Sequence, residues 1–244
     1  MKVTVVGFWH AYPEKNEATS GYLVEHGETK VLLDCGSGVL SNLGNYCDVT
    51  ELDGLVLSHY HHDHFADVGP LQYARIINES MGKNTKPLTI YGHQEDSESF
   101  SKLTYKGFVQ SSAYKEDHPL KIGPFTFTFQ RTKHPVPCFA MKVTCEKKTL
   151  VYTGDSSYFE QLAEFTKGSD LLIAECSGYR GDQVARFGHM NSEDVAKLAN
   201  SSAVDQVMIS HLPHHGEHEQ LKEEIKQSYE GEVLLARTGL TIEL

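Results

Sequence analysis

The sequence lacks the features that mark membrane, secreted and repetitive proteins. No run of about 18 apolar residues occurs, so no segment is suited to cross a membrane as a helix. The first residues, from Met1 to Gly7, alternate like a strand and lack the apolar core and cleavage site of a signal peptide. Internal repeats and low-complexity tracts are also absent. We therefore expect one domain over residues 1–244, located in the cytoplasm.

Cysteine is scarce and shows no pairing pattern. The five cysteines are odd in number and have no CxxC spacing, which argues against a disulfide framework and against a thiolate zinc site. We expect free, mostly buried thiols at Cys35, Cys47, Cys138, Cys145 and Cys176.

Basic residues are fewer than acidic ones in this sequence. Lysine and arginine number 22 against 33 aspartates and glutamates, and the formal net charge is -11. Proteins that grip a nucleic acid backbone usually present a basic face, because neutralising phosphates supplies much of the affinity. The sequence has no long basic run, so a large polyanionic substrate is disfavoured.

Short apolar segments alternate with turns and amphipathic patterns, which predicts an α/β protein whose sheets are covered by helices. The residues from Phe125 to Phe129 alternate strictly and predict a strand with one buried face. Ser192 is the expected N-cap of a helix, and the loop at 78–87 is too short to mark a domain boundary. The predicted strands are 3–6, 22–25, 30–34, 55–57, 88–91, 125–130, 140–144, 149–152, 171–174, 206–209 and 232–235. The predicted helices are 67–78, 95–106, 158–166, 192–201 and 217–228.

The segment from His59 to His64 reads HYHHDH and directly follows the apolar run 55–57 and Ser58. Neutral imidazoles and carboxylates are ligands for zinc, and also for manganese or iron, so this segment predicts a hydrolytic metal centre. A histidine-rich surface loop is the alternative. It accounts neither for the carboxylate nor for the ligand-type residues downstream.

Further ligand-type residues also follow strand-like runs. Asp155 comes after the run 150–152, His211 after 207–209, and His134 after the strand at 125–130. In sheets covered by helices, ligands gather beyond the carboxyl ends of the strands. The shared placement therefore strengthens the prediction of one metal centre.

With these motifs the chain resembles metallo-beta-lactamase-fold hydrolases, in the branch of ribonuclease Z and related phosphodiesterases. The resemblance spans nearly the whole chain and implies a four-layer αβ/βα sandwich of two mixed sheets covered by helices. It rests on the order and spacing of Leu32-Leu33-Asp34-Cys35-Gly36, the H-x-H-x-D-H segment, His134-Pro135, Thr153-Gly154-Asp155 and Ser210-His211.

The resemblance also implies a ligand set for two divalent ions, with zinc expected first and manganese as the alternative. One ion is assigned to His59, His61, His134 and Asp155. The second is assigned to Asp63, His64, Asp155 and His211, so that Asp155 bridges, while His62 occupies a variable position and is not expected to bind. Two such ions lower the pKa of a shared water and supply a hydroxide nucleophile near neutral pH. Asp34 is expected either to hydrogen-bond a ligand or to close a turn with Gly36.

Three catalytic residues follow from the same resemblance, namely Asp63, Glu175 and His189. Glu175 ends a predicted strand, and His189 precedes a predicted helix. In the ribonuclease Z branch, residues at such places form a dyad in which the histidine protonates the departing oxygen and the glutamate orients it. The alternative is a structural ion pair for Glu175 and a neighbouring role in helix capping for His189.

The chain departs from ribonuclease Z in one large feature. His134 and Asp155 are 21 positions apart in the sequence, which leaves room for a strand, a turn and a strand but not for the arm that clamps transfer RNA. We therefore expect a phosphodiesterase for a small or nucleotide-derived substrate, with a lactone or ester hydrolase as the first alternative. A non-catalytic protein with an inherited metal site is the second. Relatives are often dimers, so a homodimer is possible by resemblance alone.

Overall fold

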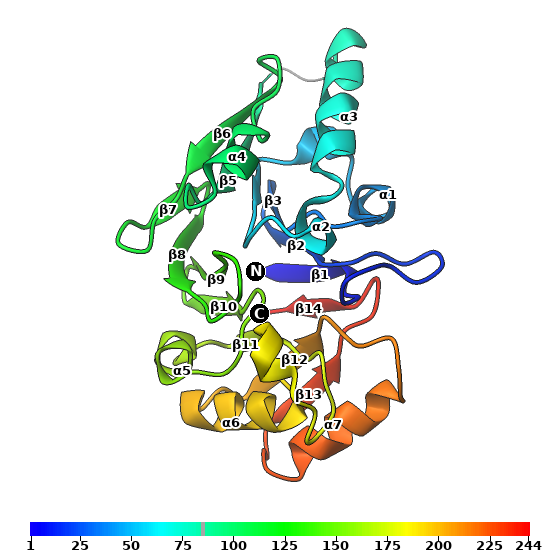
Figure 1. Cartoon of the computed structure of the whole chain (residues 1–244). Coiled ribbons are helices and arrows are strands. Elements are labelled where there is room, and N and C mark those ends of the chain that lie inside the picture. Colours follow the sequence, from blue (N-terminus) through cyan, green and yellow to red (C-terminus); the bar gives the residue numbers. More distant parts are fainter. Residues whose placement is uncertain (84–85) are drawn as a thin grey trace. The chain divides into compact units, whose positions relative to one another are not determined.

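Each of two mixed sheets has parallel strands on one side and antiparallel strands on the other in the computed structural model, which describes residues 1–83 and 86–244 (Figure 1). The first sheet has the order β14-β1-β2-β3-β4-β5-β6, and the second has the order β13-β12-β11-β10-β9-β8-β7. The chain divides into two compact units, the first formed mainly by residues 1–115 and the second mainly by residues 125–237. The prediction of a single domain is not tested by this division and stays a prediction.

The first unit contains the amino-terminal strands and helices. Its strands β3, β4 and β5 are parallel, whereas β1 and β2 pair in the antiparallel sense. The strand β14 near the carboxyl terminus lies beside β1 in the same sheet (Figure 1). The strands of this sheet are β1 (Lys2–Gly7), β2 (Gly21–His26), β3 (Thr29–Leu33), β4 (Gly54–Val56), β5 (Leu88–Gly92), β6 (Val109–Ala113) and β14 (Thr241–Glu243). The helical segments are α1 (Val39–Leu43), η1 (Val49–Glu51), α2 (His62–Phe65), α3 (Val68–Ser80) and α4 (Ser97–Ser101).

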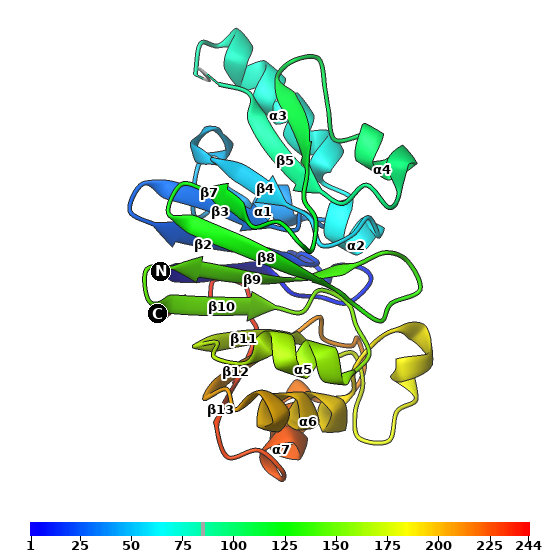
Figure 2. The ribbon, with the colours of Figure 1, turned by 90° about the vertical axis from the view of Figure 1, so that its left-hand side faces the viewer.

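The second unit is built on four consecutive parallel strands, from β10 to β13. Helices α5, α6 and α7 lie side by side along these strands (Figure 2). The strands of this sheet are β7 (Leu120–Ile122), β8 (Phe125–Arg131), β9 (Phe139–Cys145), β10 (Lys148–Tyr152), β11 (Leu171–Glu175), β12 (Gln206–Ser210) and β13 (Glu232–Leu235). The helical segments are α5 (Glu160–Thr166), η2 (Val184–Phe187), α6 (Ser192–Ser202) and α7 (His218–Lys226).

Every strand predicted from the sequence is present, with small shifts at the ends. The alternation in β8 is also confirmed, because Phe125, Phe127 and Phe129 are buried while Thr126 and Thr128 are partly exposed. The sequence prediction missed three strands in the described chain, β6, β7 and β14. The loop predicted at 78–87 lies partly outside the described residues, which omit 84 and 85.

Two helix predictions need correction. Only Ser97–Ser101 is helical in the segment 95–106, because the chain then turns back and Tyr105 pairs with Val109. The N-cap of α6 is Asn191 instead of Ser192, since the Asn191 side chain accepts a hydrogen bond from the backbone N–H of Asp194 at 3.0 Å. The Ser192 hydroxyl donates to Glu224 at 2.6 Å and ties α6 to α7.

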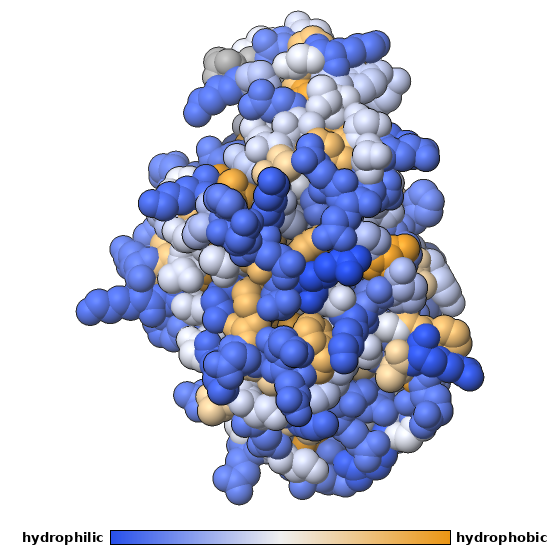
Figure 3. Space-filling view, turned by 60° about the vertical axis from the view of Figure 1, so that its left-hand side comes forward, coloured by the Kyte–Doolittle hydropathy of each residue, from blue (hydrophilic) through white to orange (hydrophobic). Residues whose placement is uncertain are grey.

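None of the helices in the described residues is long and apolar enough to cross a membrane. Hydrophilic residues cover most of the face shown in Figure 3, and the hydrophobic ones form small separate areas there. The five cysteines are free and buried, as predicted.

The two faces of β8 should differ in their contribution to stability. Phe127→Ala should lower the free energy of unfolding by about 3–5 kcal/mol, because the fully buried ring leaves a cavity. Thr128→Ala, on the partly exposed face, should cost less than about 1 kcal/mol. Urea denaturation of both variants measures these changes, and equal losses would contradict a one-sided core.

Candidate metal centre

In the first unit, the histidine-rich segment follows the carboxyl end of β4, in the middle of the parallel strands. Ser58 is held there by Asp34, which follows β3, through hydrogen bonds from the Ser58 backbone N–H and hydroxyl, both at 2.7 Å. The segment then enters the short helix α2, whose N-cap is His61. The sequence folds this way because β3 and β4 are parallel neighbours, so both strand ends reach the same edge of the sheet.

His59 and His61 converge on one point. His59 Nε2 lies 3.1 Å from His61 Nδ1. Two nitrogens bound to one tetrahedral zinc ion at about 2.0–2.1 Å are about 3.3 Å apart. The separation therefore fits two ligands of a single ion.

Asp63 and His64 form a second converging pair in the same unit. His64 Nε2 lies 3.6 Å from Asp63 Oδ2, and that oxygen also accepts a hydrogen bond from the backbone N–H of Ala11 at 3.0 Å. His64 is fully buried, and Asp63 is 9% exposed. An imidazole nitrogen and a carboxylate oxygen at this separation also suit one divalent ion.

Asp34 contacts both pairs, the first through Ser58 and the second directly through His64. Its Oδ2 lies 2.7 Å from His64 Nδ1 and accepts the Ser58 hydroxyl, which in turn lies 3.0 Å from His59 Nδ1. The carboxylate is fully buried, so the contacts with His64 and Ser58 offset its desolvation. These contacts favour the ligand-orienting role of Asp34 over closure of a turn with Gly36.

In the second unit, three functional candidates lie at the carboxyl ends of adjacent parallel strands. Asp155 follows β10, Glu175 is the last residue of β11, and His211 follows β12. His134 follows β8, which runs parallel to β10 because both are antiparallel to β9. The parallel strands therefore deliver all four side chains to one edge of this sheet.

Asp155 faces two of these histidines with different oxygens. Its Oδ2 lies 3.9 Å from His134 Nε2, and its Oδ1 lies 3.5 Å from His211 Nε2. The three side chains are each no more than 3% exposed. A carboxylate that offers one oxygen to each of two imidazoles has the arrangement that a bridging ligand requires.

Four of the ligand-type histidines have Nδ1 engaged elsewhere, so that they present Nε2; these are His59, His64, His134 and His211. His134 Nδ1 lies 3.1 Å from the Gly188 carbonyl, and His211 Nδ1 lies 3.0 Å from the Ser177 hydroxyl. His59 and His64 contact Ser58 and Asp34 in the same way. Acceptors at Nδ1 fix the tautomer that leaves Nε2 available to a metal ion. The donor set thus fits divalent metal ions.

Glu175 and His189 form the predicted pair. His189 Nδ1 lies 3.0 Å from Glu175 Oε1, and the same oxygen accepts hydrogen bonds from the backbone N–H groups of Met190 and Ser156. The His189 ring centroid lies 5.2 Å from that of His134 and 5.4 Å from that of His211. The dyad therefore sits beside the ligand-type histidines of its own unit.

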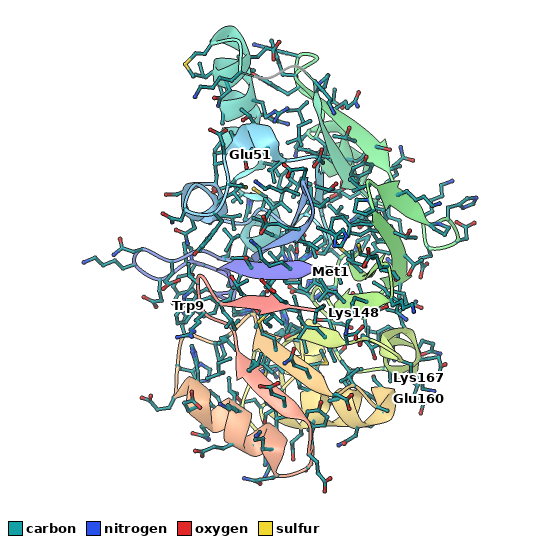
Figure 4. All side chains as sticks on the ribbon, turned by 180° about the vertical axis from the view of Figure 1, so that it is seen from behind. Met1, Trp9, Glu51, Lys148, Glu160 and Lys167 are labelled. Carbon is teal, nitrogen blue, oxygen red and sulfur yellow. The ribbon has the colours of Figure 1, made fainter. Side chains whose placement is uncertain are left out.

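Two further histidines, His62 and His218, and the aromatic residue Phe8 are assigned no place in these clusters. His62 is exposed, which agrees with its assignment as a non-ligand. His218 Nε2 contacts the Pro213 carbonyl at 2.7 Å within the loop after His211. Phe8 is 6% exposed and packs against Trp9, which follows β1 (Figure 4), so Phe8 has a packing role.

Two buried cysteines are neighbours of functional residues in the sequence, Cys35 after Asp34 and Cys176 after Glu175. Burial raises the pKa of the Cys35 thiol, with smaller contributions from Asp67 and Asp34. Burial likewise raises the pKa of Cys176, to which Glu175 adds. Both sulfurs therefore stay protonated at neutral pH.

Sequence reasoning missed Ser177 and the carbonyl of Gly188. Ser177 lies two positions after Glu175 in the sequence, and its contact with His211 depends on the pairing of β11 with β12. Gly188 has φ +84°, which turns the chain between η2 and His189. In the sequence, Ser177 could be found only as a serine near a strand-end carboxylate. Gly188 could be found only as a glycine before His189.

Replacing Asp34 should weaken both stability and metal binding. Asp34→Ala leaves the buried Ser58 and His64 donors without their acceptor, so the free energy of unfolding should fall by about 3–5 kcal/mol. Zinc affinity should fall by about 10–100-fold, because His64 and His59 lose their orientation. Thermal denaturation and chelator competition measure the two effects. Asp117→Ala, at an exposed site, is the control, and equal effects of both variants would refute this role.

Comparisons with known proteins agree with this geometry. Residues 29–212 match the beta-lactamase superfamily domain. The chain is 48% identical over 243 residues to the probable metallo-hydrolase YhfI of Bacillus subtilis strain 168, with 100% of both chains covered. The crystal structure of YhfI from Bacillus subtilis superposes with a TM-score of 0.98 at 46% identity and covers 100% of this chain and 99% of YhfI.

The predicted resemblance to the ribonuclease Z branch is supported by a more distant relative. Ribonuclease Z of Methanopyrus kandleri is 23% identical over 275 residues, which cover 97% of this chain and 95% of that protein. The two seven-stranded mixed sheets with their helices match the α/β sandwich fold, so the predicted fold class is confirmed. The chain belongs to the metallo-beta-lactamase superfamily, and this membership, with the His/Asp clusters, supports a metal-dependent hydrolase.

Proposed function

We propose that the protein is a zinc-dependent phosphodiesterase that cleaves a small or nucleotide-derived substrate. The observation that carries this proposal is the 3.0 Å contact between His189 Nδ1 and Glu175 Oε1, beside His134 and His211. Membership of a superfamily of metal-dependent hydrolases, together with the imidazole and carboxylate donors, supports hydrolysis as the reaction. The dyad favours a phosphodiester as the bond that is cleaved.

We assign two ions to the ligand set predicted from the sequence. His59, His61 and His134 would hold the first ion, Asp63, His64 and His211 would hold the second, and Asp155 would be shared by both. Zinc suits these nitrogen and oxygen donors, and manganese is the alternative. When bound, the ions would activate a water and polarise the scissile phosphoryl group.

The protein's own groups supply the proton. His189 donates Nδ1–H to Glu175, so its Nε2 is the atom that can carry a proton toward a leaving oxygen. Glu175 is 1% exposed and therefore holds its negative charge close to the imidazole without screening by water. An alkoxide is a poor leaving group, and general acid catalysis is worth roughly 10²–10⁴-fold for such a step.

The segment between His134 and Asp155 favours a small substrate over transfer RNA. It consists of β9, a two-residue turn at 146–147 and β10, as the sequence predicted. The net charge of -11 also opposes binding to a polyanion. We therefore propose a cyclic or otherwise nucleotide-derived phosphodiester as the substrate class.

Metal removal gives the first test. Purified protein should contain about two zinc ions per chain, and exhaustive chelation should abolish cleavage of bis-p-nitrophenyl phosphate. Chelation should also lower the melting temperature, because ions that bind only the folded state stabilise it. Elemental analysis, the activity assay and differential scanning calorimetry on one sample measure this. Full activity after complete metal removal would exclude the proposal.

Replacing His189 separates a phosphodiesterase from a lactone or ester hydrolase. His189→Ala should lower turnover of a cyclic nucleotide, whose leaving group is an alkoxide, by roughly 10²–10⁴-fold. Turnover of bis-p-nitrophenyl phosphate should fall much less, because nitrophenolate leaves without a proton.

His62→Ala is the matched control for this experiment, since His62 is an exposed histidine of the same metal-binding segment and is assigned no ligand role. It should leave both activities near those of the wild-type protein. Cleavage of a lactone alone by the wild-type protein would keep the metal centre and reject the phosphodiesterase assignment. Equal losses of His189→Ala on both phosphodiesters would reject the general acid.

A further inference from the structure

The Ser177 hydroxyl lies between the dyad and a ligand-type histidine. Its Oγ donates to Glu175 Oε2 at 2.8 Å and lies 3.0 Å from His211 Nδ1. A longer contact of 3.4 Å joins the same hydroxyl to the His211 carbonyl. Ser177 is 7% exposed, so water does not compete freely for these contacts.

The single hydroxyl proton sets the direction of the hydrogen bonds. Because the Ser177 Oγ–H donates to the carboxylate, its oxygen lone pairs face His211, whose Nδ1–H then donates to Ser177. His211 Nε2 is thereby left as the ligand atom, and it faces Asp155 at 3.5 Å. One serine therefore connects the tautomer of His211 to the carboxylate that orients His189.

Glu175 has a complete set of donors only with Ser177 present. Its Oε1 accepts from His189 and from two backbone N–H groups, whereas its Oε2 accepts from the Ser177 hydroxyl. Removing the Ser177 hydroxyl leaves that oxygen buried and short of a donor. The carboxylate is then expected to rotate, and His189 with it.

The first unit also contains a serine between a buried carboxylate and a ligand-type histidine, but there the carboxylate contacts a second ligand-type histidine. Ser58 donates to Asp34 Oδ2 and lies 3.0 Å from His59 Nδ1, as Ser177 does with Glu175 and His211. The imidazole in direct contact with Asp34 is His64, which is itself assigned as a ligand. In the second unit, the imidazole in direct contact with the carboxylate is the proposed general acid. Of these two serines, Ser177 is therefore the one that connects a ligand-type histidine to the proposed general acid.

We propose that Ser177 is a positioning residue that couples His211, and hence metal binding, to the orientation of the general acid His189. The coupling runs through hydrogen bonds from His211 to Ser177, from Ser177 to Glu175, and from His189 to Glu175. This inference rests on the proposed function for its catalytic consequence. The hydrogen-bond chain itself is measurable in protein without substrate.

Proton–nitrogen NMR on protein with 15N-labelled histidine tests the chain directly, with and without Zn²⁺ as the only addition. The wild-type protein should show Nδ1–H signals for both His189 and His211. In Ser177→Ala the His211 signal should be lost to exchange with water, and the His189 signal should shift. Ser177→Thr, which keeps the hydroxyl, should restore both. An unchanged His189 signal in Ser177→Ala overturns the proposal.

Kinetics and metal affinity test the consequence. Ser177→Ala should lower kcat on a cyclic nucleotide by about tenfold or more, but by less than the full loss of roughly 10²–10⁴-fold expected without the general acid, with KM within about twofold. Zinc affinity should fall by about 10–100-fold, as for other groups that orient a ligand. Because Ser177 acts through Glu175, adding Ser177→Ala to Glu175→Gln should cause little further loss of kcat. Fully additive losses would contradict the coupling.

Controls keep the outcomes separate. Ser202→Ala removes a buried hydroxyl on α6 that donates to the Leu198 carbonyl at 2.7 Å, so it should lower stability without moving the His189 signal. Ser177→Cys keeps the side-chain volume and replaces the Ala variant if that fails to fold. If wild-type protein cleaves no phosphodiester, the proposed function fails, while the NMR and zinc measurements still decide the role of Ser177.

Discussion

The burial of two carboxylates, Asp34 and Glu175, constrains the functional side chains of both units. Each is almost completely removed from water, at 0% and 1% exposure. A buried charge is tolerated only when hydrogen-bond donors replace its hydration. The donors are in each case an imidazole Nδ1–H and a serine hydroxyl, with backbone N–H groups in addition. Satisfying the carboxylates therefore also fixes the tautomers of the histidines that contact them.

Parallel strands bring these groups together. β3 and β4 place Asp34 and Ser58 at one edge of the first sheet, and β10, β11 and β12 do the same for Asp155, Glu175 and His211. Hydrogen bonds to the neighbouring strands of a buried sheet fix the position of each strand end. The side chains that follow the strands are therefore positioned by rigid elements. Short segments after the strands then add the remaining ligand-type side chains, as the short helix α2 does for Asp63 and His64.

The sequence predicted the buried strands and the chemical type of the side chains that follow them, because both are local properties. Apolar runs mark strands such as β4 and β12, and the H-x-H-x-D-H segment indicates ligand-type chemistry without reference to the rest of the chain. The edge strands β6 and β14 were missed because their polar sequences carry no such run. Ser177 was missed for a different reason. Its role exists only because β11 and β12 are neighbours, so that a residue after one strand meets a residue after the other.

Backbone strain occurs at two of the positions that matter most. Asp34 and His211 have positive φ angles of 56° and 54°, a region that costs residues other than glycine about 1–3 kcal/mol. Each follows a parallel strand directly, where the chain must turn sharply to aim a side chain along the sheet edge. Glycine would relieve the strain at either position but would remove the carboxylate that holds Ser58 and His64, or the imidazole that contacts Ser177. The strained backbone is thus retained because the side chain it aims completes a hydrogen-bonded cluster, which ties the local cost to the proposed chemistry.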